Sequence, residues 1–123
     1  MNSVILVDDQ PISNFITRKL LQVEGITIPI SDFTNPVIAL EQILKHKEEN
    51  YLIILDLNMP EMTGWEFLDK LAESNYSPKI VILTSSTSDI DKDKASEYDS
   101  VLDYIIKPLN KTKISELCSK HCK

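Results

Sequence analysis

Four short apolar runs constrain the fold of this 123-residue chain more than any other feature of its sequence. These runs are Val4–Val7, Leu52–Leu55, Ile80–Leu83 and Val101–Ile106, and a weaker run surrounds Ile26, Ile28 and Ile30. The strong runs are rich in β-branched residues and almost continuous, with Asp103 and Tyr104 interrupting only the last. Such runs are typical of strands that are buried on both faces, as in a parallel sheet.

The segments between the runs have the spacing of amphipathic helices. Their apolar stripes are Ile12, Phe15, Ile16, Leu20 and Val23; Val37, Leu40 and Leu44; Trp65, Leu68, Leu71 and Ala72; and Ile114, Leu117, Cys118 and His121. The stretch Ser85–Ser100 is more polar, and its apolar candidates are Ile90, Ala95 and Tyr98. We expect a thinly anchored helix there, capped by Thr87 or Ser88. Five repeats of strand and helix predict a single doubly wound α/β domain over residues 1–123.

Composition excludes several classes of protein. The net charge is −6 and no dense basic stretch is present, which argues against binding to nucleic acid or to an anionic membrane. The longest apolar runs have about five residues, whereas a membrane span needs roughly 20. Because the N-terminus has no charged segment ahead of an apolar one, we expect no signal peptide and a cytoplasmic protein.

Two cysteines, Cys118 and Cys122, lie in the last six residues, with His121 between them. They cannot staple the fold, and their spacing fits no standard zinc pattern, so reduced thiols on a last helix are expected. Met1 stands just ahead of the first strand, which favours a natural N-terminus. The end at Lys123 leaves open whether the chain is a stand-alone protein or part of a longer one.

Chemically useful residues follow four of the five predicted strands. Asp8-Asp9 follows the first strand, Asp56 the third, Thr84-Ser85-Ser86 the fourth and Lys107-Pro108 the fifth. Ligands of doubly wound sheets bind at the carboxyl ends of the strands, so we expect these groups to converge. Each alone is better explained as a turn residue, a helix cap or a surface charge. Four strands that end in a matching set favour a functional site.

Three carboxylates that meet at one edge repel one another unless a cation bridges them. All-oxygen ligands point to a hard ion, first of all Mg²⁺. A divalent cation, the Lys107 ammonium and the Thr84 hydroxyl around one carboxylate are the groups that stabilise a phosphoryl group during transfer. Asp56 has the best claim as the nucleophile, because an aspartyl phosphate is a known type of covalent intermediate.

The chain resembles the receiver domain of two-component response regulators, the chemotaxis-regulator-like family, over its whole length. The resemblance rests on Val4-Ile5-Leu6-Val7-Asp8-Asp9, on Ile53-Ile54-Leu55-Asp56-Leu57-Asn58-Met59-Pro60 followed by Gly64, on Ile82-Leu83-Thr84-Ser85 and on Tyr104-Ile105-Ile106-Lys107-Pro108-Leu109. It implies a flavodoxin-like (βα)5 fold with strand order 2-1-3-4-5.

The resemblance also implies roles for the acidic residues. Asp56 would be the phospho-acceptor, and Asp9 would ligate Mg²⁺ directly. Asp8 would act on the metal through a water molecule, and Asn58 would contribute its backbone carbonyl.

Further roles concern the switch. Thr84 would be the hydroxyl that moves onto the phosphoryl oxygen, Lys107 would pair with the phosphoryl group, and the Lys107-Pro108 bond would be cis. Tyr104 would be the aromatic residue that turns inward on activation. The sequence departs from the family pattern at Asp99-Ser100, where Gly-Ala is usual, and this affects the turn before the last strand and the length of the fourth helix.

The expected function is that of a phosphoacceptor signalling domain. A histidine kinase or phosphotransfer protein would donate the phosphoryl group from phosphohistidine, and the domain, a monomer or weak dimer, would switch a protein-interaction face. It would catalyse its own phosphorylation and slow dephosphorylation without being a metabolic enzyme. Two alternatives are a degenerate receiver that only docks partners and an aspartate-nucleophile phosphatase of the haloacid-dehalogenase type. The latter needs an Asp at the position of Asn58.

Overall fold

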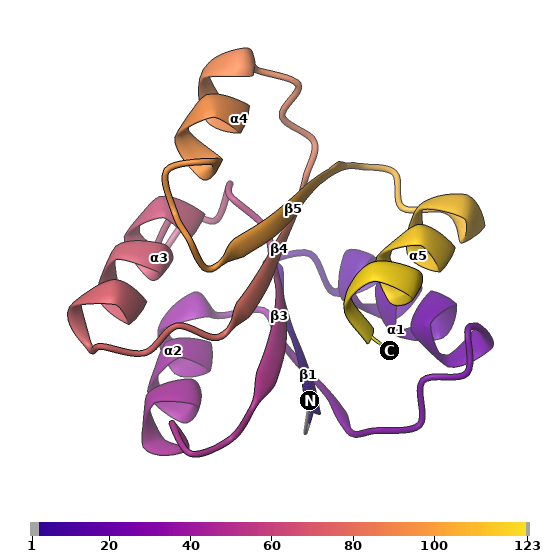
Figure 1. The fold of residues 1–123 in the computed structure, drawn as a ribbon, viewed down its shortest axis with the longest axis horizontal. Coiled ribbons are helices and arrows are strands. Elements are labelled where there is room, and N and C mark those ends of the chain that lie inside the picture. The colour runs from indigo at the N-terminus through magenta and orange to yellow at the C-terminus, as the bar shows by residue number, and fades with distance from the viewer. Residues whose placement is uncertain (1–2, 123) are drawn as a thin grey trace.

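The computed structural model describes residues 3–122, except for the side chain of Cys122, as alternating strands and helices (Figure 1). The strands are β1 (Ser3–Val7), β2 (Ile30–Phe33), β3 (Tyr51–Leu55), β4 (Lys79–Thr84) and β5 (Val101–Ile106). The helices are α1 (Pro11–Val23), α2 (Pro36–Lys45), α3 (Gly64–Glu73), α4 (Asp89–Ala95) and α5 (Lys111–Leu117), which continues into a π-helical turn, η1 (Cys118–Cys122). No helix among these residues is both long and apolar enough to cross a membrane.

The five strands form one parallel sheet in the order β2-β1-β3-β4-β5, which confirms the predicted topology. Helices α2, α3 and α4 lie on one face of this sheet, and α1 and α5 lie on the other (Figure 1). Alternate residues of each central strand enter two separate cores: Ile5 and Val7 face α2 and α3, while Val4 and Leu6 face α1 and α5. Burial on both faces explains why the runs of β1, β3 and β4 carry almost no polar residues, whereas β5 lies at the edge of the sheet and buries none of its residues fully, contrary to the expectation from its run.

The second strand is shorter than its weak apolar run. It begins at Ile30, and both Ile26 and Ile28 precede it in the loop after α1. These two side chains still pack against the core beneath α1 and α5. The backbone carbonyl of Pro29 accepts a hydrogen bond from the Val4 amide at 2.9 Å, so the loop is already attached to β1 there.

Helix α1 does not bury the apolar stripe that its spacing suggests. Its exposed large apolar side chains are Ile12, Phe15, Ile16 and Val23, of which Val23 is 71% exposed. The residues that α1 buries are Asn14, Thr17 and Leu21. The first two turns of this helix therefore present polar side chains to the sheet and apolar ones to the surface.

Helix α4 is short and weakly anchored, as the polar stretch predicts. Ser88 caps it by accepting a hydrogen bond from the Asp91 amide, and Ala95 is its one buried residue. Ile90, which we expected to anchor it, is 79% exposed. Instead, the Tyr98 ring just after the helix stacks on Trp65 of α3 with 5.9 Å between ring centroids. An aromatic contact with α3 thus replaces the missing apolar anchor.

Candidate functional site

The carboxyl ends of β1 and β3 bring three carboxylates together. Asp8 and Asp9 follow β1 and Asp56 follows β3, and each offers an oxygen within 4.8 Å of the others. The strands pair in register, with Val7 opposite Leu55, so the acidic residues leave the sheet at the same level. The convergence predicted from the sequence is therefore present in the fold.

Asp8 is held from two sides. Its carboxylate is buried, with Oδ1 accepting a hydrogen bond from the Gln10 amide at 3.0 Å. Oδ2 accepts a hydrogen bond from Lys107 Nζ at 2.6 Å. Charge-assisted hydrogen bonds of this kind are the strong ones, so Asp8 is firmly placed. Asp9, by contrast, is only half-buried.

Asp56 lies deeper between these charges. Its side chain is buried, with Oδ2 3.7 Å from Lys107 Nζ, and its Oδ1 accepts a hydrogen bond from the Asn58 amide at 3.4 Å. Burial raises the pKa of the Asp56 carboxyl above its ordinary value, and repulsion by Asp8 adds to this. The nearby Lys107 ammonium and the backbone amides of Asn58 and Leu57 lower the pKa, but burial outweighs them.

Lys107 and Thr84 are placed by the ends of β5 and β4. The Lys107 amide donates to the Thr84 carbonyl at 2.7 Å, so the two residues are joined through the backbone. The Lys107-Pro108 peptide bond is cis. Thr84 is fully buried, and its Oγ1 accepts a hydrogen bond from the Ser86 amide at 3.3 Å.

Tyr104 is not part of the acidic cluster, but it is linked to Thr84 through one intervening residue. Its hydroxyl donates to the Ser86 carbonyl at 3.0 Å, and the Ser86 amide donates to Thr84. Ser86 Oγ also donates to Asp91 Oδ2 in α4 at 2.6 Å. Ser86 therefore joins the fourth strand, the fourth helix and the aromatic ring. Sequence reasoning assigned it no role, although it stands in the segment that follows the fourth strand.

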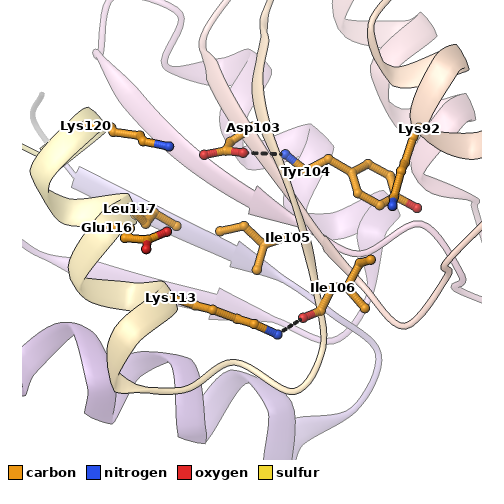
Figure 2. Close-up of a pocket in the computed structure, with 9 residues that line it drawn as sticks. All are labelled: Lys92, Asp103, Tyr104, Ile105, Ile106, Lys113, Glu116, Leu117 and Lys120. Atoms are coloured by element: carbon orange, nitrogen blue, oxygen red, sulfur yellow. Dashed lines mark hydrogen bonds between the residues drawn. The ribbon is translucent and has the colours of Figure 1, made fainter. Parts of the chain in front are cut away.

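On the other side of Tyr104, β5 and α5 border a hollow of about 350 Å³ (Figure 2). The side chains of Lys92, Lys113 and Lys120 reach it, with Asp103 and Glu116. Lys113 Nζ is bound to the Ile106 carbonyl at 2.6 Å, and Asp103 Oδ1 accepts from the Tyr104 amide at 2.9 Å. This hollow, lined by charged side chains, borders Tyr104 and includes none of the three residues of the acidic cluster.

A glycine is required at position 64, next to the backbone of Asp56 and Leu57. A Cβ atom at this position would lie 2.8 Å from the Asp56 carbonyl oxygen and 2.8 Å from the Leu57 Cα. The Gly64 amide also donates to the Leu57 carbonyl at 2.9 Å. The start of α3 therefore rests directly on the backbone that presents Asp56.

The acidic cluster suits a hard divalent cation. All three groups offer carboxylate oxygens, and such ligands select Mg²⁺, Ca²⁺ or Mn²⁺ over softer metals. Within residues 3–122 no other His, Cys, Asp or Glu side chains cluster in this way. Cys118 is buried in the core and His121 Nε2 lies 3.5 Å from Asp103, while the Cys122 side chain is outside the described residues.

The raised pKa of Asp56 predicts how stability depends on pH. A carboxyl with a raised pKa destabilises the fold when it is ionised, at pH values above that pKa. We expect Asp56→Asn to raise the melting temperature at pH 7 without divalent cations, because it removes the buried charge; each kcal/mol gained would shift such a domain by about 4 °C. The gain should shrink as the pH falls through the raised pKa and should vanish below 3.8, where Asp56 carries a proton in both the folded and the unfolded chain.

Asp99→Asn provides the matched control, because it removes the same charge from an exposed side chain. Thermal melts of the three proteins at a series of pH values measure the effect. If Asp56→Asn melted at or below the temperature of Asp99→Asn at pH 7, burial would not be the dominant influence on Asp56.

The close contact at Gly64 predicts a local effect of Gly64→Ala. The added methyl group must push the backbone at Asp56 and Leu57, and overpacking of this kind costs about 1–3 kcal/mol. Gly25→Ala is the control, because Gly25 has a φ of 90° but open space around its Cα. Both variants should melt at lower temperature, and only Gly64→Ala should shift the NMR resonances and titration of the Asp56 carboxyl. Equal Asp56 titrations would contradict the contact.

Comparison with known proteins agrees with this geometry. A model of the response regulator receiver domain family matches residues 4–119. An uncharacterized response regulatory protein of Vibrio cholerae is 28% identical over 120 residues, which are 96% of this chain and 44% of that protein. The nitrate/nitrite response regulator NarL of Escherichia coli is 33% identical over 89 residues, 72% of this chain and 40% of NarL. The chain thus spans less than half the length of these relatives.

Solved structures show the same fold. A two-component response regulator from Cytophaga hutchinsonii superposes with a TM-score of 0.83 and 27% identity, over 96% of this chain and 94% of that one. The response regulator TrrA from Thermotoga maritima, in complex with Mg²⁺ and BeF, gives a TM-score of 0.77 and 27% identity, over 98% of both chains. Since the family match extends over almost the whole chain and the strand order agrees, this chain belongs to the receiver domain family of two-component response regulators.

Proposed function

We propose that this receiver domain accepts a phosphoryl group on Asp56 in the presence of Mg²⁺ and uses it to switch a protein-interaction face. The observation that carries the proposal is Lys107, whose ammonium lies 2.6 Å from Asp8 and 3.7 Å from Asp56 within a cluster of three carboxylates. Receiver domains pair with histidine kinases or phosphotransfer proteins. The donor of this chain is then a phosphohistidine protein.

Each residue of the site has a part in the transfer. An Asp56 carboxylate oxygen attacks the phosphorus, a P–O bond forms, and the P–N bond to the donor histidine breaks with its electron pair returning to the imidazole. Asp9 and Asp56, with the Asn58 backbone carbonyl, would hold Mg²⁺, and Asp8 would act on it through a water molecule. Bound Mg²⁺ supplies positive charge that stabilises the transferring phosphoryl oxygens. Lys107 adds a second positive charge on the same oxygens.

The half-exposed state of Asp9 supports its role as the direct ligand. The Asp8 carboxylate already accepts hydrogen bonds from Lys107 and from the Gln10 amide, whereas the Asp9 side chain is partly exposed to solvent. The same machinery with water as the attacking group gives slow dephosphorylation. Neither alternative function gains support: the position two residues after Asp56 is Asn58, and the set of residues for phosphorylation is complete.

The hydrogen bonds around Ser86 support a switch that starts at Thr84. A phosphoryl group on Asp56 adds charge and acceptor oxygens, and the Thr84 hydroxyl can donate to one of them. Because the Ser86 amide is bound to Thr84 Oγ1 and the Ser86 carbonyl to the Tyr104 hydroxyl, movement of Thr84 changes the place of Tyr104. Asp91 transmits the same change to α4.

The net charge of the chain favours a protein partner. The net charge of −6 disfavours nucleic acid, so the output contact is with protein. The proposal further includes a single domain over residues 1–123, a cytoplasmic location and a monomer or weak dimer.

Phosphorylation is tested with a small donor. Incubation with acetyl phosphate and Mg²⁺ should add one phosphoryl mass to the wild-type chain, and Asp56→Asn should take up none, because the nucleophile is gone. Intact-mass spectrometry measures both. Asp99→Asn, an exposed acid, should be phosphorylated normally. A phosphorylated Asp56→Asn protein would show that another residue is the acceptor.

The switch predicts a restricted pattern of amide hydrogen exchange. With Mg²⁺ and beryllofluoride, protection should change in residues 85–100 and around Tyr104 and far less in α1. The expected coupling free energy between the phosphoryl mimic at Asp56 and the arrangement of Tyr104 and α4 is about 1–3 kcal/mol. Tyr104→Phe should weaken the response of α4, because the ring loses its hydrogen bond to Ser86.

Tyr76→Phe is the matched control, since its hydroxyl donates to the Glu49 carbonyl at 2.8 Å, away from the switch. It should respond like the wild-type chain. A uniform change in exchange, or equal behaviour of the two variants, would argue against signalling through Tyr104.

A further inference from the structure

Two polar side chains occupy the buried face of α1, where a helix that packs on a sheet ordinarily places apolar ones. Asn14 and Thr17 are each 2% exposed, and Leu21 continues the same face one turn later. Burying a polar group is costly unless it forms hydrogen bonds. The partners of these two side chains therefore show why they are tolerated.

The two side chains form different kinds of hydrogen bond. The Thr17 hydroxyl donates to the Ser13 carbonyl at 2.9 Å, one turn earlier in its own helix. The Asn14 amide instead leaves the helix: Nδ2 donates to the Asp8 carbonyl at 3.1 Å and to the Phe33 carbonyl at 3.3 Å. The Phe33 carbonyl also accepts from the Asp8 amide at 3.1 Å. One side chain thus joins α1 to the ends of both β1 and β2.

The carbonyl of Asp8 belongs to the same planar peptide unit as the amide of Asp9. When Asn14 holds this carbonyl, it fixes the orientation of the peptide and so the direction in which Asp9 leaves the backbone. Gln10 and Lys107 hold the Asp8 side chain, whereas the Asp9 side chain makes no hydrogen bond to the described residues 3–122. Asn14 is therefore the side chain that places the backbone of Asp9.

A small void lies beneath the acidic cluster and confirms how close Asn14 is to it. The void has a volume of about 10 Å³, and Asp8, Asn14, Thr17 and Asp56 are among the residues that line it. Because protein interiors are close-packed, a change of side chain at Asn14 is expected to affect the loop above.

We propose that Asn14 is a positioning residue for Mg²⁺ binding, acting through the Asp8-Asp9 peptide on the Asp9 carboxylate; this rests on the proposed function. Hydrogen bonds that orient the ligands of a metal commonly change its affinity by about 10- to 100-fold when they are removed. Asn14 donates the hydrogen bonds from α1, and Asp9 holds the ion.

The test is a Mg²⁺ titration of the 123-residue chain followed by NMR of the Asp9 amide. Asn14→Leu keeps about the same side-chain size and removes both donors, and it should weaken Mg²⁺ binding at least tenfold. Thr17→Val is the matched control, since it removes a buried hydroxyl from the same face. It should lower the melting temperature and leave Mg²⁺ affinity within twofold of the wild-type value.

A second measurement does not depend on how the variants fold. In the wild-type chain the Asn14 side-chain NH₂ resonances should shift with Mg²⁺ at the same midpoint as the Asp9 amide. Unshifted Asn14 resonances, or equal affinities of Asn14→Leu and Thr17→Val, would overturn the inference while the proposed function stood. Asp9→Ala is expected to bind no Mg²⁺. If the wild-type chain also bound none, the proposed function itself would be overturned.

Discussion

Repulsion among three neighbouring carboxylates is the constraint around which this edge of the sheet is built. Asp8, Asp9 and Asp56 converge because parallel strands end at one level, and Lys107 supplies the counter-charge that reaches two of them. Burial still raises the pKa of Asp56, so the surroundings of this carboxyl disfavour its charged form. A ligand that brings positive charge would stabilise the ionised form of such a buried carboxyl. The electrostatic cost therefore lies at the place where a cation and a phosphoryl group are proposed to bind.

The buried polar groups of the described chain are gathered in the same place. The buried polar and charged residues are Asp8, Asn14, Thr17, Asp56 and Thr84. All of them lie at or beneath the carboxyl ends of β1, β3 and β4, while the two cores on either face of the sheet are formed by apolar side chains. The apolar layers supply stability, and the cost of buried polarity is confined to the one region that requires it.

The sheet and its acidic edge could be predicted because both depend on local sequence. Continuous β-branched runs indicate buried parallel strands, and residues directly after a strand must appear at its carboxyl end. The orientation of α1 could not be predicted, because the stripe rule takes the apolar face as the buried one and Asn14 meets backbone carbonyls rather than side chains. The anchoring of α4 was equally hidden, since Trp65 and Tyr98 are distant in sequence. The close approach at Gly64 likewise depends on three-dimensional packing.

In the first two turns of α1, the residues that pack against the sheet are polar and the apolar residues lie on the surface. Packing and surface character therefore depend on different residues. The exposed apolar side chains of this helix, Ile12, Phe15, Ile16 and Val23, make no part of either buried core, whereas Leu20 and Leu21 in its second half do pack there. Ile12 and Ile16 also line a hollow of about 330 Å³ that reaches Lys107. The surface that these side chains offer to other molecules is thus formed by residues other than Asn14, which faces inward beneath the acidic cluster.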